Sequence, residues 1–297
     1  MKVRVLGSGA GGGLPQWNCG CSLCVRARAG DPDVPARSQP SLAISADGVR
    51  WSLVNASPDV RDQLARAPSL HPRPGTRDVP IDTVLLTNAD LDHVLGLLVM
   101  REALPHRIVS TRWVRDALLS HNAVFRLLEP AWGIAKLDEP VRLDPAGRLE
   151  ARLFPVPGKV PLHLDGIATN HAEATTGARI TDRETGRRLV YVPGAKSFDG
   201  GAKAELEAAA VCFVDGTFFT EGELGAVRPG APGSRAMGHV PVTGGDGSLA
   251  FLASLPGRRF YTHLNNTNPL LDAAAQEREW VRAAGVEIAH DGLELEL

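Results

Sequence analysis

The 297-residue chain is poor in aromatic residues, at 5%, and has only two tyrosines and four cysteines. It also lacks a long apolar run, since the stretch 94–100 is far shorter than the roughly 20 residues that cross a bilayer. Its N-terminus leads within a few residues into a glycine-rich segment and lacks the apolar stretch of a secretory signal. These absences predict a cytoplasmic protein without membrane insertion, whose cysteines stay reduced.

The chain also carries almost no net charge. The formal net charge is −2, so the chain has no basic field of the kind that binds nucleic acid or a membrane surface. Hydrophobic residues make up 43% and charged residues 22%, which is typical of globular proteins. No repeat, low-complexity tract or linker divides the sequence. We therefore predict one α/β domain of stacked layers over residues 1–297.

Side-chain periodicity predicts strands and helices that are interspersed along the chain. The predicted strands span residues 2–6, 42–44, 51–55, 81–87, 189–192 and 211–214. The second and third flank Asp47-Gly48, a dipeptide typical of hairpin turns. The predicted helices span residues 60–67, 91–104, 113–128 and 268–285. Ser57 has the chemistry to cap the first helix.

A glycine-rich segment follows the first predicted strand. Gly7 to Gly12 matches the dinucleotide-binding pattern G-x-G-x-x-G, which requires a helix directly after the loop. No helix is predicted there, and the acidic residues about 20 positions on, Asp31 and Asp33, lie in a proline-rich stretch. The context favours a strand-end turn that lets the backbone pass close to a site.

Three of the four cysteines form the pattern C-x-C-x-x-C at Cys19, Cys21 and Cys24. Thiolates this close in sequence can converge on one tetrahedral zinc ion, and three unliganded thiols are the alternative. Cys212 lies in an apolar strand and is expected to pack there. We predict a closed, structural Zn(II) site that stabilises the loop at about residues 7–40. Its fourth ligand is unassigned.

The most informative segment is residues 85–93, where an apolar strand runs into a polar cluster that opens a helix. A helix cap would explain Asp90 and Asp92, because carboxylates are favoured in a first helical turn. It does not explain His93, whose charged form would be disfavoured there. A neutral histidine at this place is suited to binding a metal.

Residues 88–93 resemble the metallo-β-lactamase superfamily motif H-x-H-x-D-H. Asn88 and Asp90 stand in the positions of the two leading histidines, and Asp92 and His93 match the last pair. Further segments resemble later motifs of the same superfamily, in order: residues 191–195, 213–219, 237–240 and 261–266. With the glycine loop, the cysteines and residues 262–269, the chain is similar along nearly its whole length to the coenzyme PQQ synthesis protein B family. The resemblance implies a metallo-β-lactamase-like αββα four-layer sandwich.

The departures from the superfamily pattern predict the chemistry. A dinuclear zinc hydrolase needs roughly six or seven ligands, some of them shared. Here the leading histidines, the bridging aspartate expected near residues 191–195 and the middle histidine expected near residues 155–159 are missing. Asp92, His93 and His263 remain, and two histidines with one carboxylate are the facial-triad set of non-heme iron(II) oxygenases. A hydrolase is therefore not expected.

The family resemblance implies an iron(II)-dependent hydroxylase that uses O₂ on the tyrosine ring of the peptide-derived PQQ precursor. The alternative function is a carrier that moves PQQ or its precursor towards the periplasm without catalysis. No nucleic-acid partner is expected, and a homodimer is left open.

Supporting roles are assigned to residues beside the expected metal ligands. Asp90 could accept a proton, and Asp215 and His239 could handle protons or hold a ligand, with a strand-end turn and a loop histidine as the alternatives. Lys159 and Lys196 lie near vacated ligand positions and could bind substrate carboxylates, with solvated surface as the alternative. Separately, Asn266 stands in the family position of the fourth zinc ligand, although asparagine is a poor one.

Overall fold

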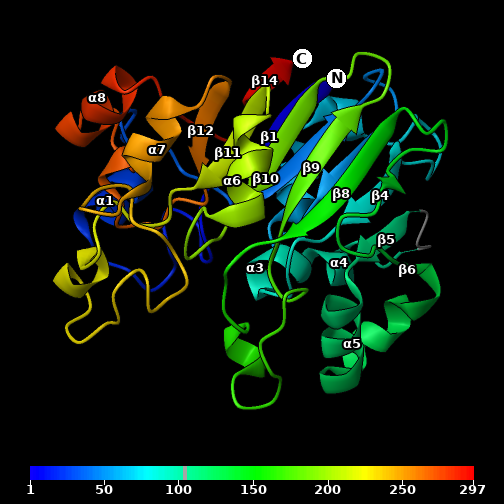
Figure 1. Cartoon of the computed structure of the whole chain (residues 1–297), viewed down its shortest axis with the longest axis horizontal. Coiled ribbons are helices and arrows are strands. Elements are labelled where there is room, and N and C mark those ends of the chain that lie inside the picture. The colour runs from blue at the N-terminus through cyan, green and yellow to red at the C-terminus, as the bar shows by residue number, and fades with distance from the viewer. Residues whose placement is uncertain (103–105) are drawn as a thin grey trace.

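Two seven-stranded mixed sheets pack face to face in the computed structural model, which describes residues 1–102 and 106–297 (Figure 1). The first sheet has the order β14 (Glu294–Glu296), β1 (Lys2–Gly7), β2 (Ser41–Ser45), β3 (Trp51–Val54), β4 (Ile81–Leu85), β5 (Arg107–Ser110) and β6 (Trp132–Ile134). The second has the order β13 (Glu287–Ile288), β12 (Arg258–Thr262), β11 (Val211–Asp215), β10 (Arg188–Val192), β9 (Thr176–Asp182), β8 (Leu149–Pro155) and β7 (Val141–Arg142).

Helices cover the outer face of each sheet, so the expected αββα four-layer sandwich is confirmed (Figure 1). The first sheet is covered by α2 (Val60–Ala65), α3 (Leu91–Val94), α4 (Gly96–Val99) and α5 (Arg112–His121). The second is covered by α1 (Ser22–Arg28), α6 (Gly200–Glu207), α7 (Ser248–Ser254) and α8 (Gln276–Ala283). Short 3₁₀ helices are η1 (Pro68–Leu70), η2 (Ala123–Ala131), η3 (Leu162–Leu164), η4 (Glu223–Ala226) and η5 (Pro269–Leu271).

Three apolar layers follow from strands that are buried on both faces. On β2, Leu42 and Ile44 point between the sheets, whereas Ala43 points to the helices. On β10, Tyr191 points between the sheets and Val190 to the helices. Because both faces are covered, these strands are nearly continuous apolar runs. Within the described ranges, no helix has the length and apolarity needed to cross a membrane.

The predicted strands and the Asp47-Gly48 hairpin are confirmed, and Gly48 has the left-handed φ of +81° that such a turn requires. Several strands were not predicted from the sequence. In β8, Leu149, Ala151 and Leu153 alternate with polar residues, so the signal was present and was overlooked. The prediction of a single domain over residues 1–297 stays a prediction.

The helix predicted over residues 91–104 is wrong as one element, because α3 and α4 divide at Leu95, and Leu104 lies outside the described residues. The cause is the chain after β3. The N–H of Ala56 donates to His93 O (2.8 Å), and its carbonyl accepts from Gly96 N (2.9 Å). The His93 carbonyl and the Gly96 N–H therefore bond to Ala56 instead of continuing the hydrogen-bond pattern of one α-helix. As a result, α3, which carries His93, is tied to the end of β3.

Two other predicted helices are shorter than expected. The helix predicted over residues 113–128 corresponds to α5, which ends at His121 because Asn122 is extended. The 3₁₀ helix η2 follows. The helix over residues 268–285 is split into η5 and α8 by the extended Asp272, although Gly285 does follow its end with φ +74°. The α2 helix starts after Asp59 rather than being capped by the Ser57 side chain. The α1 helix was missed; it begins inside the cysteine cluster, where Cys21 Sγ accepts from Cys24 N.

We expect Gly96→Ala to lower the free energy of unfolding by about 1–3 kcal/mol. A Cβ at this position would lie 2.2 Å from the carbonyl oxygen of Ser57, which is backbone and cannot swing aside. Chemical denaturation of both proteins measures the change. The matched control is Gly201→Ala in α6, where a Cβ meets nothing within 4 Å and should be neutral or stabilising. Equal losses in the two variants would contradict this account of the α3–α4 packing.

Candidate metal centre

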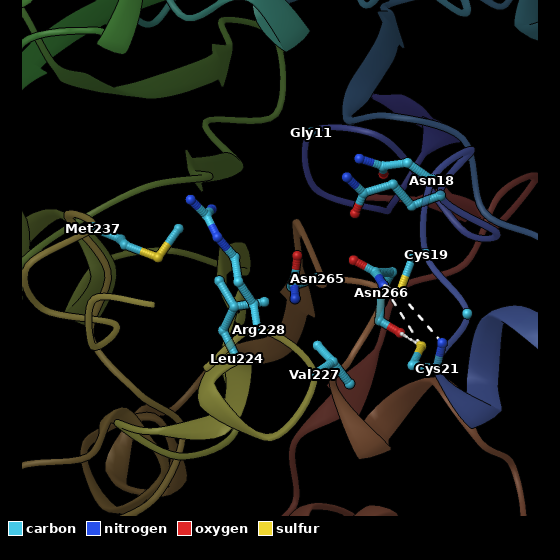
Figure 2. A pocket seen from close by; sticks show the side chains of 12 residues that line it. Gly11, Asn18, Cys19, Cys21, Leu224, Val227, Arg228, Met237, Asn265 and Asn266 are labelled. Atoms are coloured by element: carbon cyan, nitrogen blue, oxygen red, sulfur yellow. Dashed lines mark hydrogen bonds between the residues drawn. The ribbon is translucent and has the colours of Figure 1, made fainter. Parts of the chain in front are cut away.

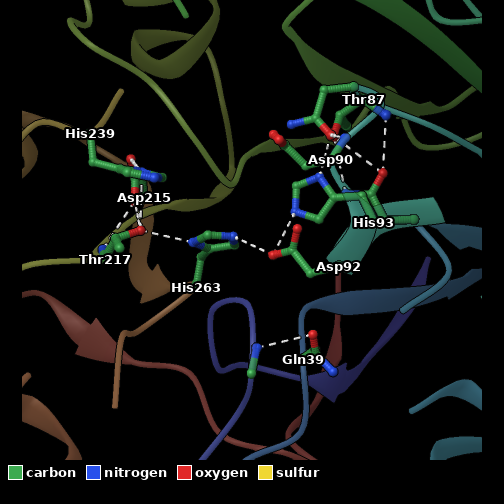
Figure 3. Close-up of polar contacts among 12 residues, drawn as sticks. Gln39, Thr87, Asp90, Asp92, His93, Asp215, Thr217, His239 and His263 are labelled. Carbon is green, nitrogen blue, oxygen red and sulfur yellow. Dashed lines mark hydrogen bonds and ion pairs between the residues drawn. The ribbon is translucent and has the colours of Figure 1, made fainter. Parts of the chain in front are cut away.

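The polar residues that follow β4, β11 and β12 meet at one edge of the sandwich (Figure 3). The glycine loop after β1 passes the same edge. The loops after β1 and β12 are joined by backbone hydrogen bonds, from Ala10 N to Leu264 O (2.8 Å) and from Leu264 N to Ser8 O (3.0 Å). His263 has a left-handed φ of 59°, a conformation that is uncommon for a residue other than glycine and that turns the chain immediately after β12. Loops on a rigid double sheet thus fix the side chains of the site.

Asp92, His93 and His263 lie together, with one potential ligand atom of each within 4.8 Å of the others. Asp92 Oδ2 is 3.1 Å from His263 Nε2 and 3.9 Å from His93 Nε2. The two imidazole rings are nearly perpendicular, at 82°, with centroids 5.5 Å apart. The structure therefore brings together the three residues that the sequence predicted as active-site metal ligands.

Asn88 determines which nitrogen of His93 is free. Its Oδ1 accepts a hydrogen bond from the backbone N–H of Asp90 (3.0 Å), so this side-chain atom is an acceptor. The same Oδ1 lies 2.7 Å from His93 Nδ1, which must therefore be the protonated, donating nitrogen. His93 Nε2 keeps its lone pair, is buried and has no partner within the described residues. Asn88, which stands in the position of a superfamily histidine, therefore orients the expected metal ligand His93.

Thr217 has the same effect on His263. The Asp215 carboxylate can only accept, so the Thr217 hydroxyl donates to Asp215 Oδ1 at 2.6 Å. That hydroxyl also lies 2.8 Å from His263 Nδ1, which consequently donates to it. Burial alone would lower the pKa of His263, but the Asp92 carboxylate, 3.1 Å from Nε2, raises it above its usual value. Nε2 therefore donates to Asp92, and a metal ion bound at this nitrogen would displace its proton. Thr217 was not assigned a role from the sequence, although it lies in the motif around Asp215.

The Nε2 atoms of two imidazoles and one carboxylate thus converge in a buried pocket, a donor set that a divalent cation can use once His263 Nε2 releases its proton. Burial lowers the pKa of His93 to about 4, so its ring is neutral at pH 7, as a ligand must be. Burial alone would raise the pKa of Asp92, but the hydrogen bond from His263 helps to hold it well below its usual range. The unpartnered His93 Nε2 and the ionised carboxylate both fit a bound metal ion.

Asp215 and His239 form a second group next to the triad, and with His263 their ligand atoms lie within 4.8 Å of one another. Asp215, however, already accepts from the N–H groups of Ala195 (3.1 Å) and Thr217 (3.0 Å), from the Thr217 hydroxyl and from His239 Nδ1 (2.7 Å). These four donors occupy the carboxylate. A Cβ at Gly194, near the expected bridging aspartate, would lie 3.7 Å from the His239 ring. The pair therefore fits a supporting role better than a second metal site.

Asp90 borders the triad, and burial together with the Asp92 charge raises its pKa to about 6. The charge of Lys159 opposes this rise, and its side chain lies against Gly238, since a Cβ there would be 3.2 Å from Lys159 carbons. Lys159 is thus placed at the site. The backbone N–H of Lys196 donates to Pro157 O (2.8 Å), and within the described parts of the chain no hydrogen bond or ion pair places its side chain at the triad.

The sulfurs of Cys19, Cys21 and Cys24 also lie within 4.8 Å of one another. The side-chain amide of Asn266 faces all three, with Nδ2 at 3.1, 3.7 and 3.4 Å respectively. Burial raises the pKa of Cys24 to about 11, so a metal that binds these thiols would displace a proton. Asn266 follows His263 by three residues, so the loop after β12 connects the two candidate metal sites.

The glycine loop passes close to the triad, as the sequence indicated. A Cβ at Gly11 would lie 3.4 Å from Asp92 Oδ2. Asn55, another residue that the sequence did not reveal, has φ 63° and bonds to Thr87 through both its amide nitrogen (3.0 Å) and its amide oxygen (3.0 Å to the backbone N). It holds the ends of β3 and β4 together directly before Asn88.

Comparison with known proteins first identifies the class of protein to which the chain belongs. A model of the β-lactamase superfamily domain matches residues 50–263. The fold is shared at lower identity by a diphosphatase of the PhnP family, with a TM-score of 0.68 and 21% identity over 100% of this chain and 97% of that one.

Within that class, this chain belongs to the coenzyme PQQ synthesis protein B family. It is 46% identical to the family member from Methylobacterium nodulans and 42% identical to that from Ruegeria pomeroyi, over 100% of both chains in each case. It is also similar to the crystal structure of Zn²⁺-bound PqqB from Methylobacterium extorquens, with a TM-score of 0.94 and 42% identity over 100% of both chains.

We expect Asn88→Ala to weaken metal binding at the triad by about 10- to 100-fold, because His93 loses the acceptor that orients its ring. Competition with a chromophoric chelator measures the affinity for Zn(II) or Co(II). Asn88→Asp is the matched variant, since it keeps an acceptor oxygen and should retain most of the affinity. Wild-type affinity in Asn88→Ala would show that this hydrogen bond does not position the ligand.

Proposed function

We propose that this protein acts in PQQ biosynthesis as an iron(II)-dependent hydroxylase of the tyrosine ring in the peptide-derived PQQ precursor. The observation that carries the proposal is the triad of Asp92, His93 and His263, whose two Nε2 atoms and carboxylate are close enough to share one ion. Two histidines and one carboxylate leave coordination positions open, as oxygenases require. Membership in the coenzyme PQQ synthesis protein B family supports a role in PQQ biosynthesis.

Iron(II) at the triad would supply O₂ activation, which a redox-inert zinc ion with the same ligands would not. Side chains next to the triad would accept and donate protons. Asp90, with a pKa near 6, can exchange a proton close to neutral pH. Asp215 fixes His239 through its Nδ1, so His239 can present the opposite nitrogen. Adding one oxygen atom of O₂ to the ring and reducing the other to water consumes two electrons, which an external reductant must provide.

We further propose a structural Zn(II) at Cys19, Cys21 and Cys24, with Asn266 over the fourth position. Three soft thiolates suit zinc, whereas the nitrogen and oxygen donors of the triad suit iron. The three sulfurs are close enough to share one ion, and α1 holds Cys24 in place. The loss of superfamily ligands at Asn88 and Gly194 argues against a dinuclear hydrolase.

The direct test supplies anaerobic, Fe(II)-loaded protein with a tyrosine-containing precursor, a reductant and then O₂. We expect O₂ consumption and a product heavier by one oxygen atom, detected by mass spectrometry. Zn(II)-loaded protein and the His93→Ala variant should form none. Absence of product above the metal-free control would contradict the hydroxylase proposal. Tight PQQ binding that persists in His93→Ala without chemistry would favour the carrier instead.

A further inference from the structure

A cavity of about 900 Å³ lies between the cysteine loop and the segment that contains η4 (Figure 2). It borders the triad, because its lining residue Gly11 is the one whose Cβ would lie 3.4 Å from Asp92 Oδ2. Asn265 and Met237, which also line it, are each two residues from a histidine of the site, His263 and His239. A ligand in this cavity would have one end beside the triad.

Among the described residues, the lining side chain with a formal charge is the exposed Arg228, and none of the lining side chains is a carboxylate. Cys19 and Cys21 also line the cavity. Figure 2 shows Arg228 and Met237 on one side, Asn18 and Cys19 on the other, and Asn265 between them. Within residues 1–102 and 106–297, no hydrogen bond or ion pair involves the Arg228 guanidinium. A cation without a partner, among neutral amides, is a binding group for an anion.

The wall that carries Arg228 is fixed. The Arg228 N–H donates to Leu224 O at 2.9 Å. At the start of η4, Glu223 accepts from Thr267 Oγ1 (2.5 Å) and from Phe219 N (2.6 Å), which ties this wall to the loop that carries His263. The backbone at Arg228 is therefore held at a set place relative to the triad, and the exposed side chain extends from a fixed point.

We propose that Arg228 binds a carboxylate of the ligand and so sets which end of it reaches the triad. This inference rests on the proposed function for the identity of the ligand, an elongated molecule that carries carboxylates. A guanidinium matches a carboxylate with two parallel hydrogen bonds, and the neighbouring amides of Asn18 and Asn265 can bind its uncharged polar groups. Arg228, rather than Lys196, would be the substrate-binding cation.

The test measures binding of PQQ, a tricarboxylate, to Zn(II)-loaded protein without O₂, so that no turnover is involved. Arg228→Gln should weaken PQQ binding by about 10- to 100-fold, as expected for a charge-assisted contact, and Arg228→Lys by less. The matched control is Arg235→Gln, which lies seven residues further along the chain and does not line the cavity. Its Nη2 already donates to Asp246 O (2.9 Å), and the variant should bind within about twofold of wild type. The uncharged PQQ trimethyl ester should bind wild type and Arg228→Gln alike.

Equal PQQ affinity in wild type and Arg228→Gln would overturn the inference, as would the absence of PQQ binding to wild type. Competition by inorganic phosphate as strong as that by PQQ would also overturn it, since the site would then be a general anion site. If Arg228-dependent binding is found while the hydroxylase assay yields no product, the proposed reaction fails and the carboxylate site stands.

Discussion

The site depends on one constraint, the convergence of two imidazole Nε2 atoms on an ionised carboxylate in a largely buried pocket. Asn88 and Thr217 each accept a hydrogen bond from the Nδ1 of a histidine, so both Nε2 atoms face Asp92. The unpartnered Nε2 of His93 and the Asp92 carboxylate favour a cation, and one metal ion that displaces the Nε2 proton of His263 would be shared by all three residues. The neighbouring hydrogen bonds are therefore as important to the site as its ligands.

The vacated superfamily positions acquire new roles in this account. Asn88 no longer contacts a metal but orients His93, and Gly194 leaves space beside His239. The loop after β12 then links three features: it carries His263, lines the cavity at Asn265 and reaches the cysteine sulfurs at Asn266. A zinc ion at the cysteines would thus stiffen the wall of the cavity in which a substrate would bind.

Much of the fold and the triad could be predicted from the sequence, because they depend on local patterns. Asp92, His93 and His263 were identifiable from motif spacing, and apolar strands such as β10 from their composition. The division between α3 and α4 was not, because it depends on hydrogen bonds to Ala56, which is distant in sequence. The roles of Thr217 and Arg228 likewise depend on three-dimensional neighbours that no local pattern contains.

The central claim is that the chain holds two separate metal ions, one at the triad and one at the cysteines. The most direct measurement is elemental analysis of purified wild type, His93→Ala and Cys21→Ala, with the exposed His290→Ala as control. The account predicts that the first variant loses iron and keeps zinc, that the second loses zinc, and that the control keeps both. Loss of the same single metal in both His93→Ala and Cys21→Ala would contradict it.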